Sequence, residues 1–96
     1  MDLEPLHTKA EKTIQTPIGL IVLENPKGFP SSESNLYFVS SDSKIKWKAE
    51  KPNASDLYTR VKLNEDGETL SAYTLGGRSC EIDLRTGKLI SQTSIQ

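Results

Sequence analysis

The chain has 96 residues, 34% of them hydrophobic and 26% charged, which is enough for one small domain with a thin core. Its formal net charge of −1 gives no overall attraction to nucleic acid or to an anionic membrane, and no apolar run approaches the roughly 20 residues of a membrane span. The single cysteine, Cys80, excludes an intramolecular disulfide and a cysteine metal cluster.

Residues 1–12 (MDLEPLHTKAEK) are polar and show no sustained hydrophobic period. We therefore expect a flexible N-terminal segment in front of a single all-β domain that spans residues 13–96. The segment also lacks the basic-then-apolar order of a signal peptide, which favours a cytoplasmic location.

The most apolar stretch of the chain lies within residues 13–24 and predicts the first strand. Its apolar residues fall on both faces of a strand, with Ile18, Leu20 and Val22 on one face and Ile21 and Leu23 on the other. We therefore expect this strand to be covered on both sides. Pro17 and Gly19 predict a bend near its start. A loop at residues 25–34 (NPKGFPSSES) follows.

Residues 36–40 (LYFVS) and 44–49 (KIKWKA) form a predicted hairpin. In the second strand, three lysines alternate with Ile45, Trp47 and Ala49, which we expect to point inward together. Trp47 is thus predicted to be the central aromatic residue of the core, in contact with Phe38 and with the strand at residues 57–63. A loop at residues 50–56 leads to that strand.

Residues 57–95 predict four further strands, joined by tight turns at Asp66-Gly67, Gly76-Gly77 and Gly87. Each strand alternates apolar and polar residues, as expected when one face is buried and the other is wet. The expected inward set is Leu57, Thr59, Val61, Leu63, Leu70, Ala72, Cys80, Ile82, Leu84, Leu89 and Ile95. The expected outward set is Tyr58, Arg60, Lys62, Tyr73, Glu81, Asp83 and Gln92. The whole chain therefore predicts an all-β fold of about seven antiparallel strands in meander order.

The sequence also contains an internal repeat. Residues 36–49 align with residues 80–93 without a gap, at an offset of 44. Apolar residues coincide at Leu36/Cys80, Phe38/Ile82 and Ile45/Leu89, and Lys44 coincides with Lys88. A period of about 40–45 residues with several strands per unit is the spacing of propeller blades.

The turn at residues 83–88 (DLRTGK) resembles the Asp-x-x-Thr-Gly-Lys turn of quinoprotein-type β-propeller repeats, which usually continue to a tryptophan three residues after the lysine. In that family the glycine is left-handed and the tryptophan docks between neighbouring blades. The earlier copy has Lys44 and Trp47 but carries Val39 and Ser43 in place of Asp and Gly. The later copy has the turn but carries Ser91 in place of Trp, so each copy holds half of the motif.

The resemblance covers about residues 36–93 and implies blade-like sheets. It does not imply the quinone cofactor, because the family's cofactor and metal ligands come from many blades and none maps onto this chain. Seven or eight strands supply at most two blades, fewer than the four to eight of a closed propeller. We therefore expect two blade-like sheets packed together, with a small closed β-barrel or an assembly of several chains as alternatives.

Candidate catalytic groups are few. His7 has neither an orienting partner nor a nucleophile near it in sequence. Cys80 is expected to be a small buried hydrophobic residue rather than a reactive thiol. Glu81 and Asp83 share one outer strand face, where carboxylates usually pair with lysine or arginine on the next strand. We therefore predict no catalytic, cofactor-binding or metal-binding residue and no enzymatic activity.

Basic and aromatic residues make the strongest candidate for an interaction surface. They adjoin if the strands at residues 44–49 and 57–63 are neighbours, and they comprise Tyr37, Lys44, Lys46, Lys48, Tyr58, Arg60, Lys62 and Tyr73. Single-stranded nucleic acid is held by such surfaces, although lysines also serve to keep strands soluble and to block edge pairing.

We therefore expect a non-catalytic binding or protein-interaction module, an inhibitor or adaptor of a protein partner. The alternatives are a single-stranded nucleic-acid-binding β-barrel and a small-ligand binder. The last strand, residues 88–95, is the expected free edge at which a partner or a second copy docks.

Overall fold

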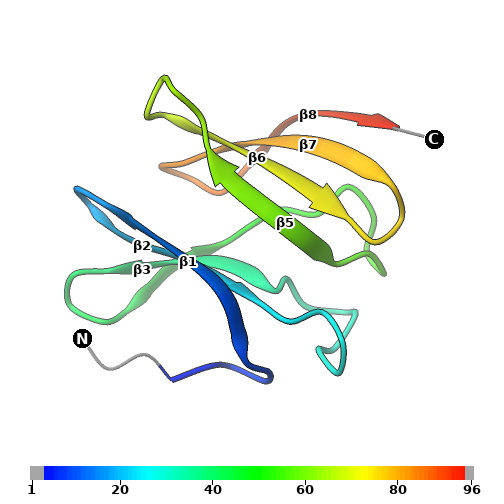
Figure 1. Cartoon of the computed structure of the whole chain (residues 1–96), viewed down its shortest axis with the longest axis horizontal. Coiled ribbons are helices and arrows are strands. Elements are labelled where there is room, and N and C mark those ends of the chain that lie inside the picture. The colour runs from blue at the N-terminus through cyan, green and yellow to red at the C-terminus, as the bar shows by residue number, and fades with distance from the viewer. Residues whose placement is uncertain (1–3, 95–96) are drawn as a thin grey trace.

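The computed structural model describes residues 4–94, which form eight strands and no helix. The strands are β1 (Ala10–Thr16), β2 (Gly19–Glu24), β3 (Leu36–Ser40), β4 (Ile45–Lys48), β5 (Tyr58–Leu63), β6 (Thr69–Thr74), β7 (Arg78–Asp83) and β8 (Leu89–Ser94). They make two antiparallel four-stranded sheets in sequence order, β1-β2-β3-β4 and β5-β6-β7-β8 (Figure 1). The all-β fold with two packed meander sheets is confirmed, and the alternative of a closed barrel is wrong.

The predicted first strand is a hairpin of two strands, which raises the strand count to eight. Thr16 pairs with Gly19, and the Thr16 Oγ1 accepts hydrogen bonds from the amides of Ile18 (3.3 Å) and Gly19 (3.1 Å). A Cβ at Gly19 would lie 2.3 Å from the Phe38 ring, so only glycine fits this turn. β1 begins at Ala10, three residues before the predicted domain boundary.

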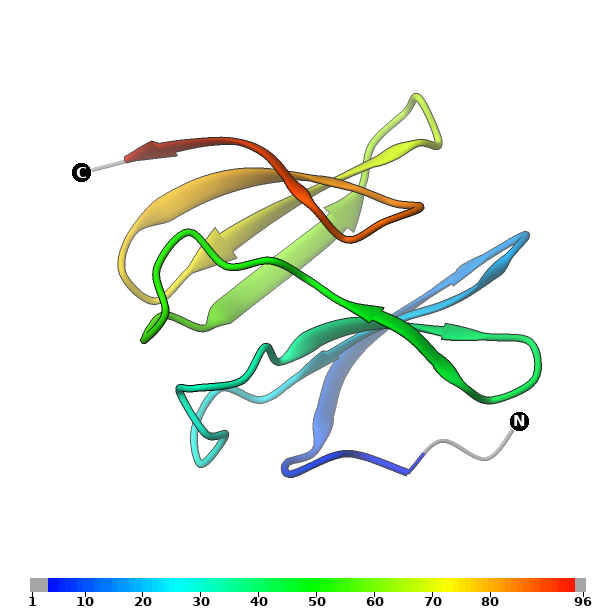
Figure 2. The same ribbon diagram turned by 180° about the vertical axis from the view of Figure 1, so that it is seen from behind.

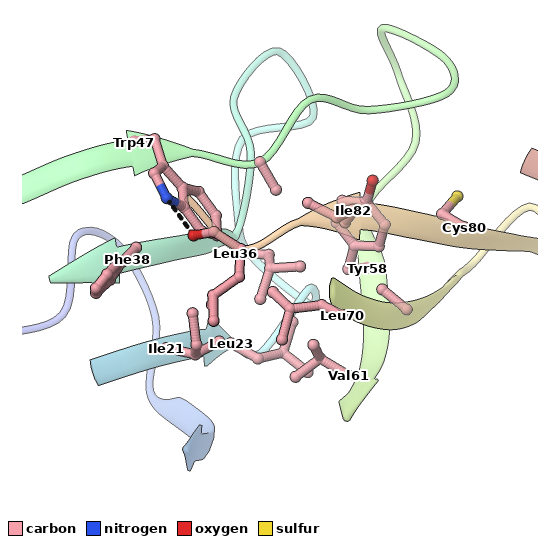
Figure 3. Packing of buried hydrophobic residues seen from close by; sticks show 13 residues of the cluster. Ile21, Leu23, Leu36, Phe38, Trp47, Tyr58, Val61, Leu70, Cys80 and Ile82 are labelled. Carbon is pink, nitrogen blue, oxygen red and sulfur yellow. Dashed lines mark hydrogen bonds between the residues drawn. The ribbon is translucent and has the colours of Figure 1, made fainter. Parts of the chain in front are cut away.

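The main core lies between the two sheets, and Figure 3 shows its side chains meeting from both sides. The first sheet contributes Ile21, Leu23, Leu36, Phe38, Trp47 and Ala49. The second contributes Tyr58, Val61, Leu70, Ala72, Cys80, Ile82 and Leu84. Trp47 is a buried core aromatic, with its ring centroid 5.7 Å from that of Phe38 in an edge-to-face arrangement. Its predicted contact with Phe38 is confirmed.

The first sheet also buries its other face. There Val22, Tyr37 and Val39 form a small second cluster, against which Leu6, Ala10 and Leu20 pack. The expectation that the apolar stretch is covered on both sides is confirmed for β2, although Ile18 in the turn is exposed.

Two residues predicted from alternation point the other way, because β-bulges change the parity of their strands. Tyr58 pairs with Thr74 while Arg60 pairs with Tyr73, so Thr59 is an extra residue and Tyr58 shares the inner face with Val61. Tyr58 was predicted to point outward and is 0% exposed. A bulge at Lys46 separates Ile45 from Trp47 in the same manner. Ile45 was predicted to point inward and is 40% exposed.

Most of the remaining inward set is buried or half-buried, and Ile95 lies outside the described residues. The 44-residue repeat is visible in the backbone. Ser43 has a φ of 66° and Gly87 a φ of 74°, at positions 44 apart. The bulged residues of β4 and β8, Lys46 and Ile90, are also 44 apart.

Candidate functional site

The basic and aromatic surface expected from the sequence does not form, because two of its three tyrosines are core residues. Tyr37 is 1% exposed and Tyr58 is 0% exposed, so neither can contact a partner. Tyr37 lies beneath the N-terminal residues, where its hydroxyl donates to the Glu24 carboxylate. The Tyr58 hydroxyl donates to the backbone carbonyl of Glu50 at 2.6 Å.

The six other predicted residues fall in two groups. Lys44, Lys46 and Lys48 lie in or just before β4, which is an outer edge of the first sheet. Arg60 and Lys62 lie in β5, beside Tyr73 of β6. Figure 2 shows the chain leaving β4 and crossing the molecule before β5 begins on the opposite side. The expected neighbourhood of β4 and β5 is therefore wrong, since β5 lies next to β1 and β2.

The second group lines a groove of about 410 Å³ between β1 and β5. Arg60, Lys62 and Tyr73 line it together with Lys12 of β1. Sequence reasoning missed Lys12 because residues 1–12 were assigned to a flexible segment. Strand alternation gave no signal there, because the bulge at Glu11 places Ala10 and Ile14 on opposite faces of the sheet.

A different kind of site is the free edge of β8. Within the described residues β8 pairs with β7 alone, and residues 90–94 are exposed. Its sequence, LISQTS, contains no charged residue. The other three edge strands each carry two, namely Glu11 and Lys12 in β1, Lys46 and Lys48 in β4, and Arg60 and Lys62 in β5.

The N-terminal residues are bound to a buried carboxylate on β2. Glu24 is fully buried and accepts hydrogen bonds from the amides of Leu6 (2.6 Å), His7 (3.0 Å) and Thr8 (2.9 Å). Burial alone would raise the pKa of Glu24, but the hydrogen bonds from Tyr37 and these amides outweigh it and hold the pKa below its ordinary value. Burial and the same carboxylate raise the pKa of Tyr37.

The candidate catalytic groups are held in structural roles. Cys80 is fully buried, and burial raises the pKa of its thiol, which disfavours the reactive thiolate. Glu81 accepts hydrogen bonds from Asn64 and Ser71, both at 2.9 Å, rather than pairing with the expected lysine or arginine. The His7 ring lies 3.1 Å from the Glu33 carboxylate, and its ring centroid is 4.9 Å from that of Phe29.

Among residues 4–94, no three or more histidine, cysteine, aspartate or glutamate side chains are grouped so that they could hold a metal ion. No helix in that part of the chain is long and apolar enough to cross a membrane.

The two halves of the repeated motif meet across the core. The indole Nε1 of Trp47 donates to the Leu84 carbonyl at 3.0 Å (Figure 3). A Cβ at Gly87 would lie 2.5 Å from the Trp47 ring, so the ring packs directly on the glycine backbone. The Glu50 amide donates to the Gly87 carbonyl at 2.8 Å, and the Glu50 carboxylate accepts from the Leu89 amide at 2.8 Å. This contact joins the sheets and leaves Trp47 and Gly87 unavailable to a ligand.

Comparison with known proteins adds a family but no activity. No curated protein and no solved structure is significantly similar to the chain. Residues 6–94 match the family model described as a domain of unknown function, DUF7957. The match includes both sheets and the N-terminal residues that bind Glu24. The chain therefore belongs to the DUF7957 family.

Proposed function

We propose that the protein is a non-catalytic protein-interaction module that accepts a strand of its partner at the free edge of β8. The observation that carries the proposal is the absence of charge from β8, in contrast to the other three edge strands. Natural proteins protect exposed edges with charged side chains, especially lysine, because unprotected edges pair with other chains.

The geometry of β8 suits strand addition. Residues 91–94 pair with β7 in regular register, from Ser91↔Glu81 to Ser94↔Arg78, and the bulge at Ile90 lies before them. A regular, uncharged edge offers its outward backbone groups to an incoming strand, and such hydrogen bonds supply affinity without a deep pocket. The side chain of Ile90 is 58% exposed and adds an apolar contact beside this edge.

The role of a binder rather than an enzyme is supported by what the titratable groups already do. Cys80 is buried, Glu81 is hydrogen-bonded to Asn64 and Ser71, and His7 lies against Glu33. The module then acts as an adaptor or an inhibitor, in the cytoplasm, where a free thiol such as Cys80 stays reduced. The incoming strand can come from a different protein or from a second copy of the chain.

Kinship with quinoprotein-type propeller blades belongs to the same proposal. It is supported by the docking of Trp47 on Gly87 and by the left-handed backbone at both Ser43 and Gly87. Two four-stranded blades that do not close into a ring leave four edge strands, β1, β4, β5 and β8, and β8 is the uncharged one.

The test places a charge on the β8 edge. Ile90→Lys gives β8 the residue that β4 has at the equivalent position, Lys46. We expect this variant to melt like the parent but to lose the partner captured from native cells, or the dimer measured by light scattering. The matched control is Leu75→Lys, since Leu75 is similarly exposed, at 63% against 58%, but lies in the β6–β7 turn. A parent that captures no protein and remains a monomer, or an Ile90→Lys variant that keeps its partner, contradicts the proposal.

A further inference from the structure

The groove between β1 and β5 lies on the side of the second sheet opposite to β8 (Figure 1). We infer that it is a binding site for a small phosphate ester that carries a planar ring, such as a nucleoside monophosphate. This inference does not depend on the proposed function of β8, because the two sites occupy opposite edges of one sheet.

The charge of the groove points to an anionic ligand. Three cationic side chains line it, Lys12, Arg60 and Lys62, against one acidic side chain, Glu11. Within residues 4–94 none of the three cations has an ion pair or a side-chain hydrogen bond. Lys48 and Lys51 differ, since Lys48 lies 3.6 Å from Glu33 and Lys51 donates to three backbone carbonyls. The cations of the groove are therefore free to meet a ligand.

The backbone of both walls is bent at the groove. β1 has a bulge at Glu11, directly before Lys12, and β5 has a bulge at Thr59, directly before Arg60. Bulges are frequent beside functional sites, where the extra residue redirects the side chains that follow it. Lys12 and Arg60 thus each follow a bulge in the first strand of their sheet, and both line the groove.

The phosphate is favoured by the type and number of these cations. Arginine presents a planar fork that binds a phosphate through two parallel hydrogen bonds, and lysine adds a compact charge. Arg60 stands directly opposite Tyr73 in the β5–β6 ladder, so a ligand held by its guanidinium lies beside the tyrosine.

The ring is favoured by the rest of the lining. Tyr73 is half-buried and supplies an aromatic face on which a planar group can stack. Leu23 and Val61 also border the groove, but they are core residues with 2% and 3% exposure, so Tyr73 supplies the surface on which the ring can lie. A volume of about 410 Å³ lies within the range of small-molecule pockets, about 300–1,000 Å³. A long polyanion is less well matched, because the three lysines near β4 lie at the other edge of the first sheet.

The experiment is an NMR titration of the labelled protein with adenosine monophosphate, adenosine and inorganic phosphate in parallel. We expect saturable shifts confined to β1, β5 and β6, with a Kd for adenosine monophosphate below about 1 mM. Adenosine and phosphate alone should each bind at least about tenfold more weakly, since each fills half of the site. Arg60→Gln should weaken adenosine monophosphate at least about tenfold. Lys44→Gln, which removes an exposed lysine outside the groove, should leave binding unchanged.

Three results would overturn the inference. The first is the absence of saturable shifts up to about 10 mM adenosine monophosphate in a protein that melts normally. The second is an equal loss of binding in Arg60→Gln and Lys44→Gln, which would indicate a diffuse charge effect. The third is a single-stranded oligonucleotide that binds far more tightly than the mononucleotide and depends on the lysines near β4, which would identify a nucleic-acid surface instead.

Discussion

The two sheets have the same strand order, yet they differ in how many of their faces are buried. The first sheet is apolar on both faces, and the N-terminal residues cover its outer face through Glu24. The second sheet is apolar on one face only, and its outer face carries a hydrogen-bonded network of Asn64, Ser71 and Glu81. Identical topology therefore does not fix which faces are available to partners. In this protein the second sheet has the polar, uncovered face.

Each sheet also supplies a different residue to the contact that joins them. The first supplies the ring of Trp47 and the second supplies Gly87, on which that ring packs. At the 44-residue offset, Ser43 of the first sheet corresponds to Gly87, and Ser91 of the second sheet corresponds to Trp47. A second tryptophan–glycine contact is therefore not possible between positions 43 and 91. The two sheets thus contribute complementary halves of one interface.

The largest change in stability should come from removing the indole ring of Trp47. Trp47→Ala should lower the free energy of unfolding by about 3–5 kcal/mol, because it leaves a cavity and an unpaired Leu84 carbonyl. Ser91→Ala, at the equivalent and exposed position of the other sheet, should change stability by less than about 0.5 kcal/mol. Urea denaturation of both variants measures the difference. Equal stabilities for the two would mean that the sheets are not held together at Trp47.

The next largest effect should come from the other half of the contact. Gly87→Ala should cost about 2–4 kcal/mol, because a Cβ there meets the Trp47 ring and an L-residue is strained at a φ of 74°. Gly67 is the matched control, since its φ is 70° but no atom lies within 4 Å of its added Cβ. Gly67→Ala should cost only about 1–2 kcal/mol. If the two alanine variants melt alike, backbone strain alone accounts for Gly87 and the packing contributes nothing.

The contact between the N-terminal residues 6–8 and the first sheet can be weakened without changing the contact between the sheets. Glu24→Gln should cost about 1–3 kcal/mol, because the amide accepts the hydrogen bonds of residues 6–8 and Tyr37 less well than a carboxylate does. Glu65→Gln, at an exposed carboxylate, should change stability little.

The pH dependence should identify the same group. Because the pKa of Glu24 is lower in the folded protein than in the unfolded chain, its contribution is complete above about pH 4.5 and is lost as the pH falls through the folded-state pKa. Denaturation between about pH 3 and pH 7 should show a shallower acid loss in Glu24→Gln than in the parent. An unchanged acid slope would mean that other carboxylates cause the acid loss.

Local sequence signals predicted the fold well and the surfaces poorly. Asp66-Gly67 and Gly76-Gly77 mark turns whose chemistry is local, so the hairpins of the second sheet could be found without tertiary information. Tyr58 and Ile45 could not be oriented, because a bulge changes side-chain parity and leaves no mark in a hydrophobic pattern.

The prediction of the basic and aromatic surface was wrong because of contacts between residues that are far apart in the sequence. Tyr37 is buried because residues more than twenty positions earlier fold over it, and strand alternation carries no information about such a cover. The groove pairs Lys12 with Arg60 because β5 returns beside β1, which only the packing of the sheets decides.

The smallest expected effect should come from the turn at Ser43, which has the same left-handed backbone as the turn at Gly87. Ser43 has a left-handed φ of 66°, which costs an L-residue about 1–2 kcal/mol, whereas Gly87 occupies the equivalent turn without that strain. Ser43→Gly should therefore stabilise the protein by about 0.5–1 kcal/mol, after allowance for the greater freedom of glycine in the unfolded chain. Ser41→Gly, in the same exposed turn but without a positive φ, should instead cost about 0.5–1 kcal/mol. A gain in stability for Ser43→Gly together with a loss for Ser41→Gly would show that the turn at Ser43 has the left-handed backbone of the turn at Gly87 although it carries serine in place of glycine. A loss of stability in both would mean that the serine at position 43 is needed for a contact, and that the two turns are alike in shape alone.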